Sequence, residues 1–181
     1  WSFTTSGDQE YTVWDTGTAP PVPSENDPNA VELGVKFTVD AAGAITGIRF
    51  YKGIGNTGTH IGSLWTSSGQ PLASAQFVNE TSSGWQQVNF GSPVLVSPGT
   101  VYVASYHAPN GNYASSPGYF ANSGEDAGPI NLLQDGVSGG NGVYSYSAIS
   151  TFPSSSWNAS NYWVDVIYST DTSDTTGPAV S

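Results

Sequence analysis

The side chains that could carry chemistry in this chain are few. Histidine occurs only at His60 and His107, and the sequence contains no cysteine and no methionine. Disulfide bonds, thiolate metal sites and cysteine nucleophiles are therefore excluded. The residues that flank each histidine show no metal-binding spacing, and most of the acidic residues lie in segments without aromatic neighbours, unlike the paired carboxylates of glycosidases. We therefore expect no catalytic site, and we interpret both histidines as loop-end residues bonded to the backbone.

Acidic side chains dominate the charge. The chain has 14 Asp and Glu against 3 Lys and Arg, which gives a formal net charge of −11. With so few cations it cannot neutralise a row of phosphates, so we expect no nucleic-acid partner, no anionic membrane surface and no membrane insertion. The oxygen-rich stretch 24–28 could instead hold Ca²⁺, which takes about six to eight oxygen ligands. The predicted ligands of this structural ion are Asp27, Glu32 and Asp165, which would join the first loop to the last strand.

Ion pairing is the alternative interpretation of the same acidic residues. All three basic residues lie between positions 36 and 52. The alternation of the sequence places Lys36 and Arg49 on one outer face of a predicted hairpin. Either could pair with Asp165 or Glu32 across strands, and an exposed pair of this kind contributes at most about 1 kcal/mol. The sequence leaves both alternatives open.

Aromatic residues, at 13% of the chain, favour a binding surface. Sugars present apolar C–H faces rimmed by hydroxyl groups, and proteins meet them with flat rings edged by polar groups. Several aromatic residues fall at strand ends or in loops beside polar residues, although packing in the core is the alternative role for each. If loops 53–60 and 107–120 converge, His60, His107, Tyr113 and Lys52 would form a polar rim. The predicted ligand-binding residues are Tyr51, Lys52, His60, Trp65, Tyr106, His107, Tyr113 and Tyr119.

The elements that must position these residues are predicted to be strands. Apolar residues alternate with polar ones, and the 22 Gly and 12 Pro interrupt them at short intervals. This spacing is typical of an all-β, antiparallel β-sandwich, jelly-roll-like and similar to carbohydrate-binding modules. The predicted strands are Trp1–Thr5, Val31–Val39, Ala44–Lys52, His60–Thr66, Pro71–Val78, Gly84–Phe90, Val101–Tyr106, Val143–Tyr146 and Asn161–Tyr168.

The predicted organisation is a single sandwich domain over residues 1–168. Residues 7–30 form an acidic, Pro-rich loop, and residues 107–142 form a long loop whose aromatic residues favour ordered packing. Residues 169–181 are polar and are predicted to be a linker towards a following module. The absence of an initiator Met indicates a fragment of a longer chain, and the low-Lys, Cys-free composition is similar to that of secreted bacterial modules.

Five motifs carry a resemblance to a known family. They are Glu32-Leu33-Gly34-Val35-Lys36-Phe37, the glycine-rich stretch from Gly47 to Trp65, Gly84-Trp85-Gln86-Gln87-Val88, Tyr106-His107-Ala108-Pro109-Asn110-Gly111 and Tyr162-Trp163-Val164-Asp165-Val166. Together they resemble the bacterial domain of unknown function 4082 over about residues 31–168.

The resemblance implies an accessory module of secreted or cell-surface bacterial proteins, beside immunoglobulin-like domains and carbohydrate-active enzymes. It implies a β-sandwich that binds a polysaccharide or glycan and contacts neighbouring domains of its own chain, and it supplies no catalytic residue set. The Gly-Pro-Ala-Val stretch near residue 180 is similar to the start of an immunoglobulin-like neighbour. The alternative function is that of a structural spacer or adhesive module without a small-molecule ligand.

Overall fold

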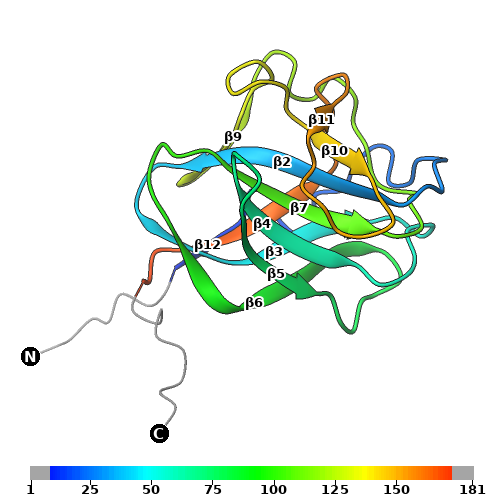
Figure 1. The fold of residues 1–181 in the computed structure, drawn as a ribbon, viewed down its shortest axis with the longest axis horizontal. Helices are drawn as coiled ribbons and strands as arrows, with labels where there is room; N and C mark the ends of the chain where they lie inside the picture. Colours follow the sequence, from blue (N-terminus) through cyan, green and yellow to red (C-terminus); the bar gives the residue numbers. More distant parts are fainter. Residues whose placement is uncertain (1–8, 173–181) are drawn as a thin grey trace, which may run out of the picture.

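The computed structural model describes residues 9–172, which form two antiparallel sheets stacked as a β-sandwich (Figure 1). The smaller sheet has the order β1 (Glu10–Tyr11), β12 (Val164–Ser169), β3 (Gly43–Lys52) and β6 (Gly84–Val96). The larger sheet has the order β11 (Ser155–Ser156), β10 (Val143–Tyr146), β2 (Val31–Val39), β7 (Tyr102–Ala108), β4 (Ile61–Thr66) and β5 (Pro71–Gln76), and β9 (Ile130–Leu132) pairs with both β2 and β8 (Glu125–Ala127). The predicted all-β sandwich is thus confirmed.

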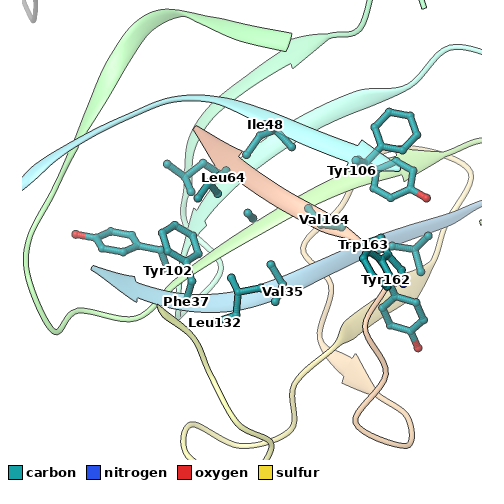
Figure 2. Close-up of a cluster of buried hydrophobic side chains, with 14 of the residues drawn as sticks. Val35, Phe37, Ile48, Leu64, Tyr102, Tyr106, Leu132, Tyr162, Trp163 and Val164 are labelled. Carbon is teal, nitrogen blue, oxygen red and sulfur yellow. The ribbon is translucent and has the colours of Figure 1, made fainter. Parts of the chain in front are cut away.

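The core lies between the two sheets and follows the period-two pattern of the sequence. Val35 and Phe37 of β2 face Ile48 of β3 and Val164 of β12, and all four side chains are at most 2% exposed (Figure 2). Successive residues of a strand point to opposite faces, so one apolar residue in two is enough to build such a core.

Most predicted strands are found close to their expected bounds. Residues 31–39 and 143–146 form strands as predicted, whereas the strand from residue 84 extends to Val96. The long predicted loop 107–142 contains the hairpin β8–β9, and the acidic loop 7–30 contributes β1, which pairs with β12. The predicted strand Trp1–Thr5 and positions 173–181 of the predicted linker lie outside the described residues.

The strands β2 and β3 are consecutive in the chain but belong to different sheets. Lys36 and Arg49 therefore do not share the outer face of a hairpin, contrary to the expectation from alternation. The turn at residues 40–42 connects the two sheets, because β2 pairs with β7 and β10 while β3 pairs with β12 and β6.

The central strands β7 and β12 are covered on their outer faces as well as on their core faces. Every residue of β7 and of β12 is buried, including the residues that point away from the core. At one end of the sandwich the loop before β2 meets the segments that follow β7 and β10 (Figure 1). Backbone hydrogen bonds tie them together, from Asn112 N to the Asp27 carbonyl at 2.7 Å and from Ser147 N to the Ala30 carbonyl at 3.1 Å. Gly111, at φ +58°, permits this approach, since a Cβ there would collide with the Asp27 carbonyl.

No helix in the described part of the chain is both long and apolar enough to cross a membrane.

Candidate functional site

Five aromatic side chains line a cavity of about 290 Å³. The cavity lies at the end of the sandwich where the loop before β2 meets the segments that follow β7 and β10. We call it the tyrosine cleft, and its lining residues are Tyr113, Tyr144, Tyr146, Trp157 and Tyr162. Tyr146 and Trp157 are 56% and 57% exposed, an unusual state for large aromatic side chains. The cleft is therefore lined by aromatic side chains, two of which are largely exposed to solvent.

Separate segments of the chain supply these rings. Tyr144 and Tyr146 are two residues apart on β10 and so share one face of the strand. Tyr113 comes from the loop after β7. Trp157 and Tyr162 flank a turn between β11 and β12 in which Asn158 and Ala159 have positive φ.

The rings meet edge to face. The ring planes of Tyr113 and Tyr162 are inclined by 80°, those of Tyr144 and Tyr162 by 75°, and those of Tyr144 and Tyr146 by 74°. This geometry brings the positive edge of one ring to the negative face of another, and each such pair adds about 0.5–1.5 kcal/mol beyond burial. Contacts between the rings thus fix the relative orientation of the tyrosines that line the cleft.

Asp27 fixes the hydroxyl groups of two of these tyrosines. Its Oδ2 accepts hydrogen bonds from the Tyr146 hydroxyl at 2.6 Å and from the Tyr113 hydroxyl at 3.2 Å, and its Oδ1 accepts from the Asn29 amide groups. Burial alone would raise the pKa of Asp27, but these hydrogen bonds together hold it below its ordinary value. The hydrogen bond between the Tyr146 hydroxyl and Asp27 also raises the pKa of Tyr146. Asp27 is therefore a carboxylate that holds the Tyr113 and Tyr146 side chains of the cleft in position.

A second cavity, of about 360 Å³, shares Tyr146 with the tyrosine cleft. Apart from Tyr146, its lining residues are small, and they are Asn29, Ala30, Ser147 and Ala148. The exposed ring of Tyr146 therefore lines both cavities.

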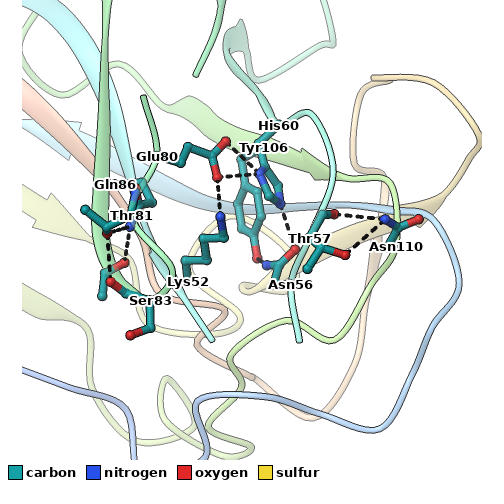
Figure 3. A network of polar contacts seen from close by, with 11 residues as sticks. Lys52, Asn56, Thr57, His60, Glu80, Thr81, Ser83, Gln86, Tyr106 and Asn110 are labelled. Atoms are coloured by element: carbon teal, nitrogen blue, oxygen red, sulfur yellow. Dashed lines mark hydrogen bonds and ion pairs between the residues drawn. The ribbon is translucent and has the colours of Figure 1, made fainter. Parts of the chain in front are cut away.

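The loops 53–60 and 107–120 converge as predicted, since the Asn110 side chain donates to the carbonyl and the hydroxyl of Thr57 at 3.2 Å (Figure 3). The predicted rim does not form, however, because His60 is fully buried and His107 is almost fully buried. Tyr106, another predicted ligand-binding residue, is fully buried as well. The ring of Tyr106 stacks on Phe50, with centroids 4.0 Å apart. Tyr106 turns inward because its ring gains more from burial in the core than from exposure to solvent.

His60 forms a buried polar network with its neighbours. Its Nδ1 lies 2.8 Å from Glu80, which pairs with Lys52 at the same distance, and its Nε2 lies 2.8 Å from the Asn56 amide oxygen (Figure 3). Burial lowers the pKa of His60, and the hydrogen bond that its ring donates to the Glu80 carboxylate opposes this effect. Asn56 in turn donates to the Tyr106 hydroxyl at 3.1 Å. The network fastens the loop 53–60 to β7.

The other predicted ligand-binding residues lie apart from one another. His107 is 4% exposed and its Nε2 lies 2.9 Å from the Ser147 carbonyl. Trp65 donates to Ser105 on the outer face of the larger sheet, and Tyr119 donates to Glu125 at 2.6 Å. Tyr51 lines a separate cavity of about 260 Å³ beside Lys52. Of the eight predicted residues, Tyr113 alone lines the tyrosine cleft.

The three predicted metal ligands belong to three different sites. Asp165 pairs with Arg49 at 2.7 Å on the smaller sheet, which is one of the ion pairs that the sequence allowed. Glu32 is fully buried on the larger sheet and accepts from the Ser105 hydroxyl at 2.6 Å. Asp27 belongs to the tyrosine cleft. Among residues 9–172 no group of three or more His, Cys, Asp or Glu side chains is placed to hold a metal ion.

Sequence reasoning did not include Tyr144, Tyr146, Trp157 or Tyr162 among the predicted ligand-binding residues. One signal was available, because Tyr144 and Tyr146 alternate in the correctly predicted strand 143–146 and must share a face. Nothing in the sequence relates Trp157 and Tyr162 to that face, since both come from a turn with irregular backbone.

The fold and the cleft define a β-sandwich domain with an aromatic cleft at one end. Residues 17–164 match the family described as a domain of unknown function, DUF4082, and the chain belongs to this family. No curated protein matches the chain in sequence.

Proposed function

We propose that this domain is a non-catalytic accessory module of a secreted bacterial multidomain protein, and that it binds carbohydrate in the tyrosine cleft. The observation that carries the proposal is the gathering of five aromatic rings in one open cavity with a carboxylate among their hydroxyl groups. Exposed rings can stack on the C–H faces of a sugar, and the polar groups beside them can bond its hydroxyl groups. The adjoining cavity gives room for a second sugar unit.

The environment of the histidines supports a non-catalytic role. Both are buried, and their ring nitrogens bond Glu80, Asn56 and the Ser147 carbonyl. Residues 136–140 fit the Gly-x-Ser-x-Gly pattern of a hydrolase nucleophile. They lie in the loop between β9 and β10, where the Ser138 carbonyl accepts from Lys36 at 2.6 Å. That setting differs from the strand-to-helix turn which exposes such a nucleophile.

Binding to a panel of soluble and insoluble polysaccharides tests the proposal. Trp157→Ala and Tyr146→Ala should each weaken binding about tenfold or more, because a buried aromatic contact at a binding site contributes well over 1 kcal/mol. Leu95→Ala is the matched control, since Leu95 is also 57% exposed but lies on β6. Equal affinities for all three variants, or no binding by the unmodified domain to any glycan, would favour the spacer function instead.

A further inference from the structure

We propose that the tyrosine cleft prefers glycans whose sugars carry a protonated amino group, an inference that rests on the carbohydrate-binding function proposed above. Three independent features of the site lead to it: the distribution of charge, the hydrogen-bonding state of the tyrosine hydroxyl groups, and the inclination of the rings.

The cations of the chain are all engaged away from the cleft. The chain has only 3 basic residues for 14 acidic ones, and none of the three lines the cleft. Their closest acceptors are the Ser138 carbonyl for Lys36 at 2.6 Å, Asp165 for Arg49 at 2.7 Å and Glu80 for Lys52 at 2.8 Å. An acidic polysaccharide, with uronate or sulfate groups, would find no counter-charge in this site. A cationic glycan would approach a protein of net charge −11 with electrostatic attraction.

The hydrogen bonds of Asp27 leave the cleft rich in acceptors. A tyrosine hydroxyl has one proton to donate, and Tyr113 and Tyr146 both give theirs to Asp27 Oδ2. Their phenolic oxygens, which also lie close to each other, then have no further proton to donate and can only accept hydrogen bonds. An ammonium group has only donors, so it fits these oxygens and the carboxylate between them. A carboxylate or sulfate group has only acceptors and fits neither.

The rings add attraction for a compact cation. The negative faces of aromatic rings attract an ammonium group within about 6 Å of their centres. A flat sugar ring stacks best on one open face, whereas walls inclined by 74–80° surround a small group from several sides. In the tyrosine cleft the exposed rings of Tyr146 and Trp157 can stack on the sugar while the inclined tyrosines receive its amino group.

Three oligosaccharides that share length and β-1,4 linkage test the proposal by isothermal titration calorimetry. They are built of glucosamine, N-acetylglucosamine and glucose, and are compared at a pH where the free amine is protonated. We expect the glucosamine oligomer to bind about five- to tenfold more tightly than the other two, from cation–π attraction and a partly exposed ion pair together. Added salt should reduce this preference, because it screens charge.

Two variants separate a local effect from that of net charge. Asp27→Asn should lower the ratio of the glucosamine affinity to the glucose affinity, and Asp126→Asn, which removes an exposed carboxylate on β8, should preserve that ratio. Equal affinities of the unmodified domain for all three oligomers would overturn the amino-group preference and leave the carbohydrate function intact. Failure of every glycan in the wider panel to bind would overturn both. Binding of choline alone, with no oligomer bound, would also overturn both and would indicate a site for quaternary ammonium groups.

Discussion

The outer faces of the two sheets each bury a carboxylate, and they stabilise it in different ways. On the smaller sheet, Asp165 lies 2.7 Å from Arg49 and accepts hydrogen bonds from the backbone of Val13, Trp14 and Val166. On the larger sheet, Glu32 is bonded by the Ser105 hydroxyl and the Thr151 amide, with no cation in contact. Both carboxylates are fully buried.

The comparison shows how a neighbouring cation affects the pKa of a buried carboxyl group. Burial raises the pKa of both carboxyl groups, since it disfavours the charged form. Arg49 and the backbone amides oppose that shift at Asp165. At Glu32 neutral donors alone oppose it, and the pKa is raised to about 7. The smaller sheet thus holds a charge pair beneath Trp14 and Trp85, whereas the larger sheet holds a carboxyl group that is half protonated near neutral pH.

Removing Arg49 should have the largest effect on stability. Arg49→Met leaves Asp165 buried without its cation, and we expect the free energy of unfolding to fall by about 3–5 kcal/mol. Urea denaturation measures this loss. The double variant Arg49→Met, Asp165→Asn should recover part of it, because Asn is uncharged and still accepts from the backbone amides. No recovery in the double variant would show that Arg49 acts through its packing on Trp85 and not through charge.

The next effect is a dependence of stability on pH that comes from Glu32. Its pKa is raised in the folded state, so its contribution is fully present below the ordinary value of 4.5 and is lost as the pH rises through about 7. Over that window the free energy of unfolding should fall by about 3 kcal/mol from this group.

Urea denaturation at several pH values tests this expectation, with Glu32→Gln as the comparison. Glutamine keeps an acceptor for Ser105 and Thr151 but cannot ionise, so the variant should lose most of this slope. An unchanged slope in the variant would assign the pH dependence to other groups.

The smallest effect is expected at the third carboxylate, Asp27, which is partly exposed. Tyr146→Phe removes one hydrogen bond to it, and we expect the free energy of unfolding to fall by less than about 1 kcal/mol. Such hydrogen bonds hold the pKa of Asp27 below its ordinary value. The contribution of Asp27 to the free energy of unfolding is therefore present when the pH is above that ordinary pKa, and it is lost as the pH falls. The variant should therefore raise the pKa of Asp27, which an NMR titration of its carboxyl carbon measures. A lower or unchanged value would contradict the role that we assign to Tyr146.

The sequence by itself determined most of the long strands and the residues that they contribute to the core. The apolar residues of Val31–Val39 alternate with period two, and this pattern fixes both the strand and the face that enters the core. It also determined the acidic, cation-poor character of the chain and the choice of Arg49 as a candidate partner for Asp165. These conclusions depend on local geometry and composition, and both can be derived directly from the amino-acid sequence.

Only the tertiary structure decided which aromatic rings gather in the tyrosine cleft. In β7 both faces are buried, so alternation could not reveal that Tyr106 and His107 are covered on opposite sides. Trp157 reaches the rings of β10 through a turn with positive φ, and Asp27 reaches them through a loop without periodic pattern. A cleft built from irregular loops depends on contacts between residues that are distant in sequence, and no local pattern encodes such contacts.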